Sequence, residues 1–229
     1  MKNFLLSLRF VIKRVFRLTA ANIAWLICFA AVIAALTVVM AVVPETRGSE
    51  DYPFYLSTVP FLTVFLFFGL SSLYLDIYAS VYIRTSGLYK CLRTRAVQVF
   101  LLMISVAALT PAIIVTAVVN PSALPDFLLV SAIIIGVSLP LASTYFLMWI
   151  VFFGYSIFNL IAGFFGEHFM VEGFKFLPTE LTDSLPVAAL LSVAILLAGL
   201  IVSFIVSDII FRIRKRPRDR QMLKGTMQA

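Results

Sequence analysis

Long apolar runs separated by short polar segments dominate the chain. These runs cover about 20–43, 54–80, 97–119, 127–165 and 185–210. A hydrocarbon core of about 30 Å takes roughly 20 residues of helix to cross. Lipid offers the backbone no hydrogen bonds, which favours helices. At 39 residues, the run 127–165 is too long for one crossing and predicts two short spans joined near "SLPLAS" (138–143). The pattern therefore predicts an all-α integral membrane protein with six spans.

The first 19 residues follow an amphipathic helical period instead. One arc of roughly 160° collects the polar residues, and Leu6 and Phe10 are the exceptions to the apolar opposite face. The polar positions are Lys2, Asn3, Ser7, Arg9, Lys13, Arg14 and Arg17. This sidedness predicts a helix lying in the membrane interface. We therefore divide the chain into an interfacial helix (1–19), a six-span domain (20–210) and a basic tail (211–229), which either lies on the membrane surface or is disordered.

Composition agrees with a membrane protein. Hydrophobic residues make up 62% of the 229 residues and charged residues only 13%, whereas a soluble domain carries about 25% charged residues. The two cysteines, Cys28 and Cys91, lie in unlike settings and are expected to be free thiols.

The cations are distributed very unevenly between the two sides of the predicted layout. Sixteen of the 18 Lys and Arg residues lie on the side that receives both termini and the segment between spans two and three. They are Lys2, Arg9, Lys13, Arg14, Arg17, Arg84, Lys90, Arg93, Arg95, Arg212, Arg214, Lys215, Arg216, Arg218, Arg220 and Lys224. The other side holds only Arg47 and Lys175. Positive charge stays on the cytoplasmic side, so we expect a multi-pass protein of the bacterial plasma membrane with both termini cytoplasmic.

Two acids lie near the predicted inner ends of spans. Asp76 is in span two, and Asp208 is in span six with Arg212 four residues later. An acid at membrane depth suggests a proton or ion site, but an i,i+4 cation suggests a structural ion pair. Because both acids are near an interface rather than the midplane, we favour the ion pair.

Candidate catalytic groups are sparse. The single histidine, His168, has Glu167 and Glu172 nearby in an outer loop, which is a weak signal for a metal site. The chain shows no phosphate-binding glycine loop, no Cys–His pair and no serine nucleophile motif. We therefore expect no enzyme activity, no cofactor, no metal and no nucleic acid binding in this chain.

The outer connection between spans five and six (166–184) mixes aromatic residues with charges, as in "GEHFMVEGFKFLPTELTDSLP". A plain polar loop does not need so many apolar side chains. We expect short re-entrant helices there, shielded by protein.

The segment "VYIRTSGLYKCLRTRAVQVF" (81–100) is basic and contains no acid. With the preceding run it reads "VPFLTVFLFFGLSSLYLDIYASVYIRTSGLYKCLRTRAVQVF" and resembles the membrane subunits of ABC-2 type exporters, also called type V transporters. Gly69-Leu70-Ser71-Ser72 fits one element of that family's pattern, and Arg84 with Gly87 fits a second. Ile83 stands where the family has Glu, and the usual proline of the segment is missing.

This resemblance implies a function. Residues 84–96 would form a cytoplasmic coupling helix that docks into a separate ATPase subunit, which binds ATP and Mg. Leu88, Leu92 and Val97 would be apolar anchors, and the cations Arg84, Lys90, Arg93 and Arg95 an electrostatic rim. A second membrane subunit would complete the pathway, and the substrate would be an amphipathic or hydrophobic peptide, lipid or drug-like molecule moved outward.

Two other functions fit the sequence. One is a substrate-capturing membrane subunit of an uptake transporter. The other is a membrane assembly or sensor protein without a transport role, whose basic surfaces bind only lipid and partners.

Overall fold

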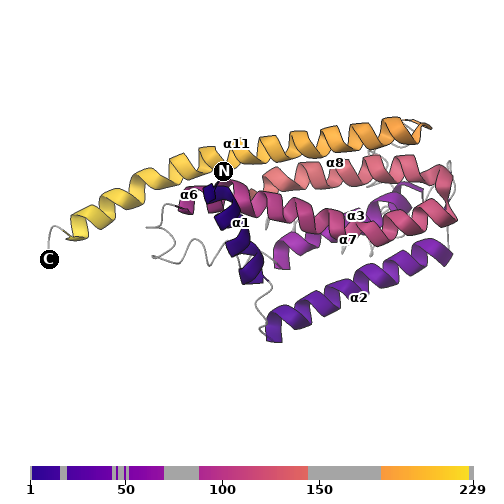
Figure 1. Cartoon of the computed structure of the whole chain (residues 1–229), viewed down its shortest axis with the longest axis horizontal. Helices are drawn as coiled ribbons and strands as arrows, with labels where there is room; N and C mark the ends of the chain where they lie inside the picture. The colour runs from indigo at the N-terminus through magenta and orange to yellow at the C-terminus, as the bar shows by residue number, and fades with distance from the viewer. Residues whose placement is uncertain are drawn as a thin grey trace, which may run out of the picture.

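The computed structural model of the protein describes residues 2–15, 20–42, 45, 49, 52–69, 88–143 and 182–226. Helices make up almost all of this part of the chain, and no β-strand occurs in it (Figure 1). The helices are α1 (Lys2–Val15), α2 (Ala20–Val42), α3 (Tyr52–Gly69), α6 (Tyr89–Cys91), the π-helical η1 (Leu92–Ala96), α7 (Val97–Val119), the 3-10 turn η2 (Pro121–Ala123), α8 (Leu124–Ser143) and α11 (Leu185–Thr226).

Three helical stretches are long and apolar enough to cross a membrane: Tyr89–Val119, Pro121–Ala142 and Leu185–Ile213. Two shorter apolar helices cover Ile27–Val42 and Tyr55–Val64. The predicted apolar runs 20–43 and 97–119 thus appear as α2 and α7 with nearly the same limits. The all-helical membrane class agrees with the sequence, while residues 70–80 of the predicted second span lie outside the described residues.

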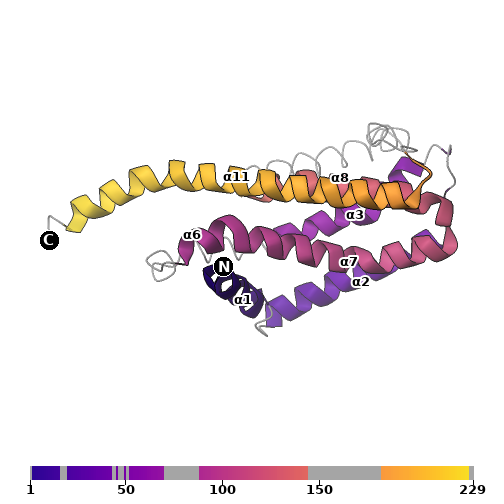
Figure 2. The same cartoon turned by 45° about the horizontal axis from the view of Figure 1, so that its top comes forward.

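The two ends of the bundle differ in chemistry. At one end, which we call the tyrosine end, Tyr55 on α3 contacts the end of α2, and Tyr52 contacts Asp126 at the start of α8. At the other, the basic end, α1 packs against η1 while α6 and η1 meet α11 (Figure 2). Consequently α2 and α7 run toward the tyrosine end, and α3, α8 and α11 run toward the basic end.

Helices α8 and α11 are parallel neighbours in very close contact. Gly136 meets Gly199, and three to four residues further along the Ser203 hydroxyl donates to the Leu139 carbonyl at 3.2 Å. A Cβ added to Gly199 would overlap the Gly136 carbonyl oxygen and would lie 2.7 Å from the Gly136 Cα. Small residues permit this kind of backbone approach between helices in lipid.

The predicted join near 138–143 does not interrupt α8 before Ser143, because this helix continues through Pro140. Proline removes one backbone donor, so the carbonyl four residues earlier, that of Gly136, loses its helical partner. That carbonyl faces Gly199 of α11. The contact between α8 and α11 therefore accommodates Pro140, the residue that suggested a break in the helix. Residues 144–165 lie outside the described part.

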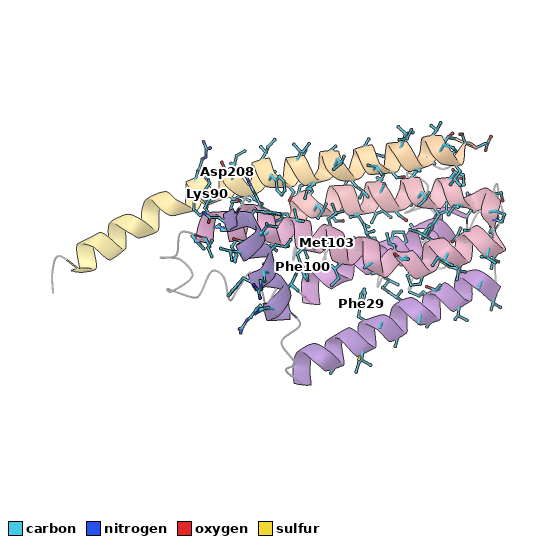
Figure 3. The ribbon with its side chains drawn as sticks, in the orientation of Figure 1. Phe29, Lys90, Phe100, Met103 and Asp208 are labelled. Carbon is cyan, nitrogen blue, oxygen red and sulfur yellow. The ribbon has the colours of Figure 1, made fainter. Side chains whose placement is uncertain are left out.

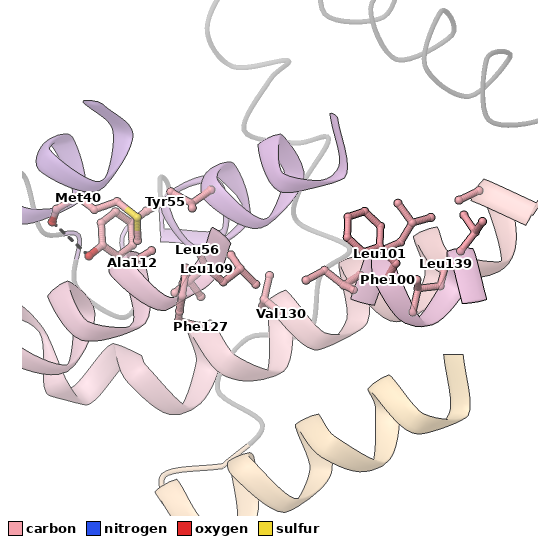
Figure 4. Close-up of a cluster of buried hydrophobic side chains, with 14 of the residues drawn as sticks. Met40, Tyr55, Leu56, Phe100, Leu101, Leu109, Ala112, Phe127, Val130 and Leu139 are labelled. Carbon is pink, nitrogen blue, oxygen red and sulfur yellow. Dashed lines mark hydrogen bonds between the residues drawn. The ribbon is translucent and has the colours of Figure 1, made fainter. Parts of the chain in front are cut away.

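Buried apolar side chains from seven of the elements form one core. It draws on Val11 of α1, Met40 of α2, Leu56 of α3, Leu92 of η1 and, among others, Leu109 of α7 and Phe127 of α8. Figure 4 shows the part where the Tyr55 hydroxyl donates to the Met40 carbonyl at 3.4 Å. Helices α1 and η1 thus pack into the same hydrophobic core as the rest of the bundle.

The coupling segment is not a separate helix in the part described. From Tyr89 the chain runs through α6 and η1 into α7 without interruption. Its five π-helical residues, Leu92–Ala96, widen the helix by one residue per turn at the basic end. Residues 89–96 of the predicted coupling helix are therefore the first two turns of the helix that continues as α7, and residues 84–87 lie outside the described part.

Two terminal elements also differ from expectation. In α1, Ser7 and Val11 are both buried against the protein, although Ser7 belongs to the predicted polar arc. Leu6 and Phe10, the two exceptions to the pattern, are exposed instead. At the other terminus, α11 continues as helix to Thr226, well past the predicted span end at 210, and extends beyond the bundle (Figure 1).

A candidate docking site at the basic end

The candidate site is a cluster at the basic end that joins the start of the α6–η1–α7 helix to α11. We call it the basic joint. It consists of Tyr89, Lys90, Arg93, Asp208, Phe211 and Arg212. Figure 3 shows Lys90 and Asp208 approaching each other from these two elements.

Asp208 is the acidic centre of the basic joint. Its Oδ2 accepts from Arg212 Nη2 at 2.8 Å and from Arg212 Nε at 2.9 Å, one turn along α11. This confirms the i,i+4 ion pair predicted from the sequence. Its Oδ1 lies 3.4 Å from Lys90 Nζ, a contact across 118 positions of the chain that local spacing cannot reveal. Asp208 therefore links α6 to α11 and also forms the ion pair with Arg212 within α11.

Arg93 is enclosed by aromatic rings. Its guanidinium carbon lies 5.4 Å from the Phe211 ring centroid and 6.0 Å from that of Tyr89, and the two rings meet at 5.6 Å. Its Nη1 donates to the Tyr89 hydroxyl at 3.3 Å. A cation over an aromatic face within about 6 Å is attracted by the ring quadrupole, more strongly where water is excluded. At 6% exposure Arg93 is a structural residue of the joint.

The predicted roles of three residues change accordingly. Leu92 and Val97, expected to be apolar anchors for a partner, are buried inside this chain at 3% and 0% exposure. Arg93, expected on the rim, is buried as well. The reason is that α1 and α11 pack on η1 and cover the face that carries them.

The surface that remains is basic. Lys90 and Arg95 are exposed, Arg212 is exposed beside them on α11, and Leu88 and Cys91 are half-buried. Below them the Gln98 amide donates to Ser207 at 3.4 Å and continues the connection to α11. Such a surface can bind carboxylate or phosphate groups through charge-assisted hydrogen bonds.

Several predicted residues fall outside the described part of the chain. These are Arg84, Gly87, Asp76, His168, Glu167, Glu172 and the outer segment up to 181. Cys28 and Cys91 are both described and are free thiols, as expected.

A second polar cluster, at the tyrosine end, was not anticipated. The Tyr52 hydroxyl donates to Asp126 Oδ2 at 2.8 Å, and both residues are almost completely buried. Nearby the Asn120 side chain donates to the Glu45 carbonyl at 2.8 Å. The one sequence signal was Asp126 in the first turn of a helix, where a negative charge is favourable. The first bond joins α3 to α8, and the second joins the residue after α7 to the chain that follows α2.

Within the described ranges, no group of three or more His, Cys, Asp or Glu side chains could hold a metal ion. Comparison of the chain with family models, with curated proteins and with solved structures found no match in any of the three.

Proposed function

We propose that this chain is the membrane-spanning subunit of an ATP-driven exporter, in which a separate cytoplasmic ATPase docks on the basic end. The observation that carries the proposal is the exposed pair Lys90 and Arg95 on a helix that leads directly into the bundle. A partner that binds this segment can move α7 and α11, because the basic joint links both to it. The substrate would be an amphipathic or hydrophobic molecule moved outward.

The directions of the helices support six crossings with both termini on one side. Helices α2, α3, α7 and α8 alternate in direction. Helix α11 runs parallel to α8, so the chain between them has to return to the tyrosine end. One further crossing within 144–181 would provide that return. The strong cation excess at the basic end supports a cytoplasmic location for that end.

The outward side of α11 suits a lipid environment or a second subunit. Leu190, Leu197, Ile201 and Ile205 are all more than half exposed along this helix. In the proposed function, two such bundles form the pathway. The ATPase would supply ATP and Mg²⁺ binding.

The test is copurification of the tagged subunit in mild detergent. We expect an ATPase to accompany the wild-type chain. Lys90→Gln with Arg95→Gln should weaken its binding in a salt-dependent manner, because exposed charges act over about 8 Å at physiological ionic strength. The matched control is Arg9→Gln with Lys13→Gln, which removes the same charge from exposed positions of α1 at the same end.

The outcomes separate the alternatives. Equal loss of ATPase in both double variants would mean that only total charge matters and that 89–96 is not the docking element. An ATPase that binds elsewhere, with inward substrate capture, would indicate an uptake subunit. Absence of any ATPase would favour an assembly or sensor protein.

A further inference from the structure

Asp208 forms ion pairs with two cations, and the two pairs differ in how readily they separate. Arg212 is on the same helix, four residues away, and makes two contacts with Oδ2. Lys90 comes from another helix and makes one longer contact with Oδ1. The carboxylate therefore stays paired when Lys90 leaves, since its pair with Arg212 is independent of α6.

Lys90 is also accessible to a partner. Its side chain is 61% exposed, against 76% for that of Arg212 and 29% for that of Asp208. Exposed ion pairs are weak, and double-mutant cycles often find them close to neutral. Arg93, one turn further along, is buried between Tyr89 and Phe211 and holds the segment against α11 without help from Lys90. Lys90 can thus exchange its partner while the joint stays assembled.

We propose that Asp208 is an internal substitute for an acidic side chain of the docking partner. In the free subunit, the Asp208 carboxylate forms an ion pair with Lys90. On docking, a carboxylate of the partner replaces Asp208 in the ion pair with Lys90, and Asp208 remains paired with Arg212. This inference rests on the proposed function, because it names the chemistry of the ATPase surface, which is acidic where it faces Lys90 and Arg95.

The substitute makes docking a competition within one site. It lowers the affinity of the basic segment for every acidic surface by the same factor, because only the fraction of subunits in which Lys90 has left Asp208 can bind. Removing Asp208 should therefore strengthen docking, and it should do so only through Lys90. Loss of a merely structural acid would weaken docking or leave it unaltered.

The experiment measures binding of the copurified ATPase to the full chain in nanodiscs. Asp208→Asn should tighten binding by about 1.5- to fivefold, the range expected for release of one exposed ion pair. Lys90→Gln should weaken binding, and adding Asp208→Asn to Lys90→Gln should give no gain. The matched control is Asp183→Asn, an exposed acid just before α11 at its opposite end, where the same change of charge should have no effect.

A second measurement does not need the ATPase. Acetic anhydride at limiting concentration should acetylate Lys90 faster in Asp208→Asn than in the wild type, with Lys13 as the internal reference. Unchanged Lys90 reactivity, or an ATPase that binds the wild type but gains nothing from Asp208→Asn, overturns this inference and leaves the proposed function intact. A wild-type chain that binds no ATPase overturns both.

Discussion

At the scale of single residues, several polar side chains of this apolar chain link one helix to another. Asp208 and Arg93 join α6 and η1 to α11 at the basic end. Tyr52 and Asp126 join α3 to α8 at the tyrosine end. A buried polar group that loses its partner costs more than the net contribution of the bond. The stability of the bundle should therefore depend on a small number of positions.

The Tyr52–Asp126 pair gives the clearest stability prediction. Tyr52→Phe leaves the buried Asp126 carboxyl without this donor and should lower the unfolding free energy by about 1–3 kcal/mol. Thermal unfolding in detergent measures the effect. Tyr52→Phe combined with Asp126→Leu should recover part of the loss, because both polar groups are then removed. A Tyr52→Phe variant as stable as the wild type would show that the hydrogen bond contributes nothing.

At the scale of elements, helix contacts decide what the sequence pattern leaves open. The α8–α11 interface depends on Gly136 and Gly199, where the two backbones touch. The η1 segment depends on α1 and α11, which cover Leu92 and Arg93. Both interfaces pair positions that are distant in the sequence.

Gly199→Ala should separate α8 from α11. Its methyl group would overlap the Gly136 backbone, which cannot move as a flexible side chain would, and such overpacking costs about 1–3 kcal/mol. Ala198→Leu, at an exposed position one residue earlier, is the matched control and should be tolerated. Thermal unfolding of the two variants compares them directly. Equal behaviour of both would contradict the close helix contact.

These contacts also explain what the sequence can and cannot predict. Apolar runs defined α2 and α7 almost to the residue, and i,i+4 spacing predicted the Asp208–Arg212 pair, because both signals are local. The Lys90–Asp208 contact and the burial of Leu92 depend on which helices become neighbours. Pro140 suggested a break in the helix, because it leaves the Gly136 carbonyl without a helical hydrogen bond. The sequence pattern does not show that Gly199 of α11 faces this carbonyl.

At the scale of the whole molecule, the basic and tyrosine ends give the bundle a polarity that can be tested across a membrane. Cysteines introduced at Ser49 and Thr182 should react with an impermeant thiol reagent added outside the cell. Native Cys91, which is half-buried at the basic end, should be protected there. Since Cys28 is also a free thiol, the test uses a Cys28→Ala background. Outside labelling of Cys91 that requires no permeabilisation would reverse the proposed orientation.

The π-helical turn Leu92–Ala96 has a mechanical consequence for the segment that precedes it. A π turn holds one residue more than an α turn, so conversion of η1 to α-helix would change the hydrogen-bond register by one residue. Each residue of an α-helix rotates the chain by about 100°. Lys90 would then swing around the helix axis away from Asp208 while α7 stayed in place. The π turn therefore sets the register in which Lys90 faces Asp208.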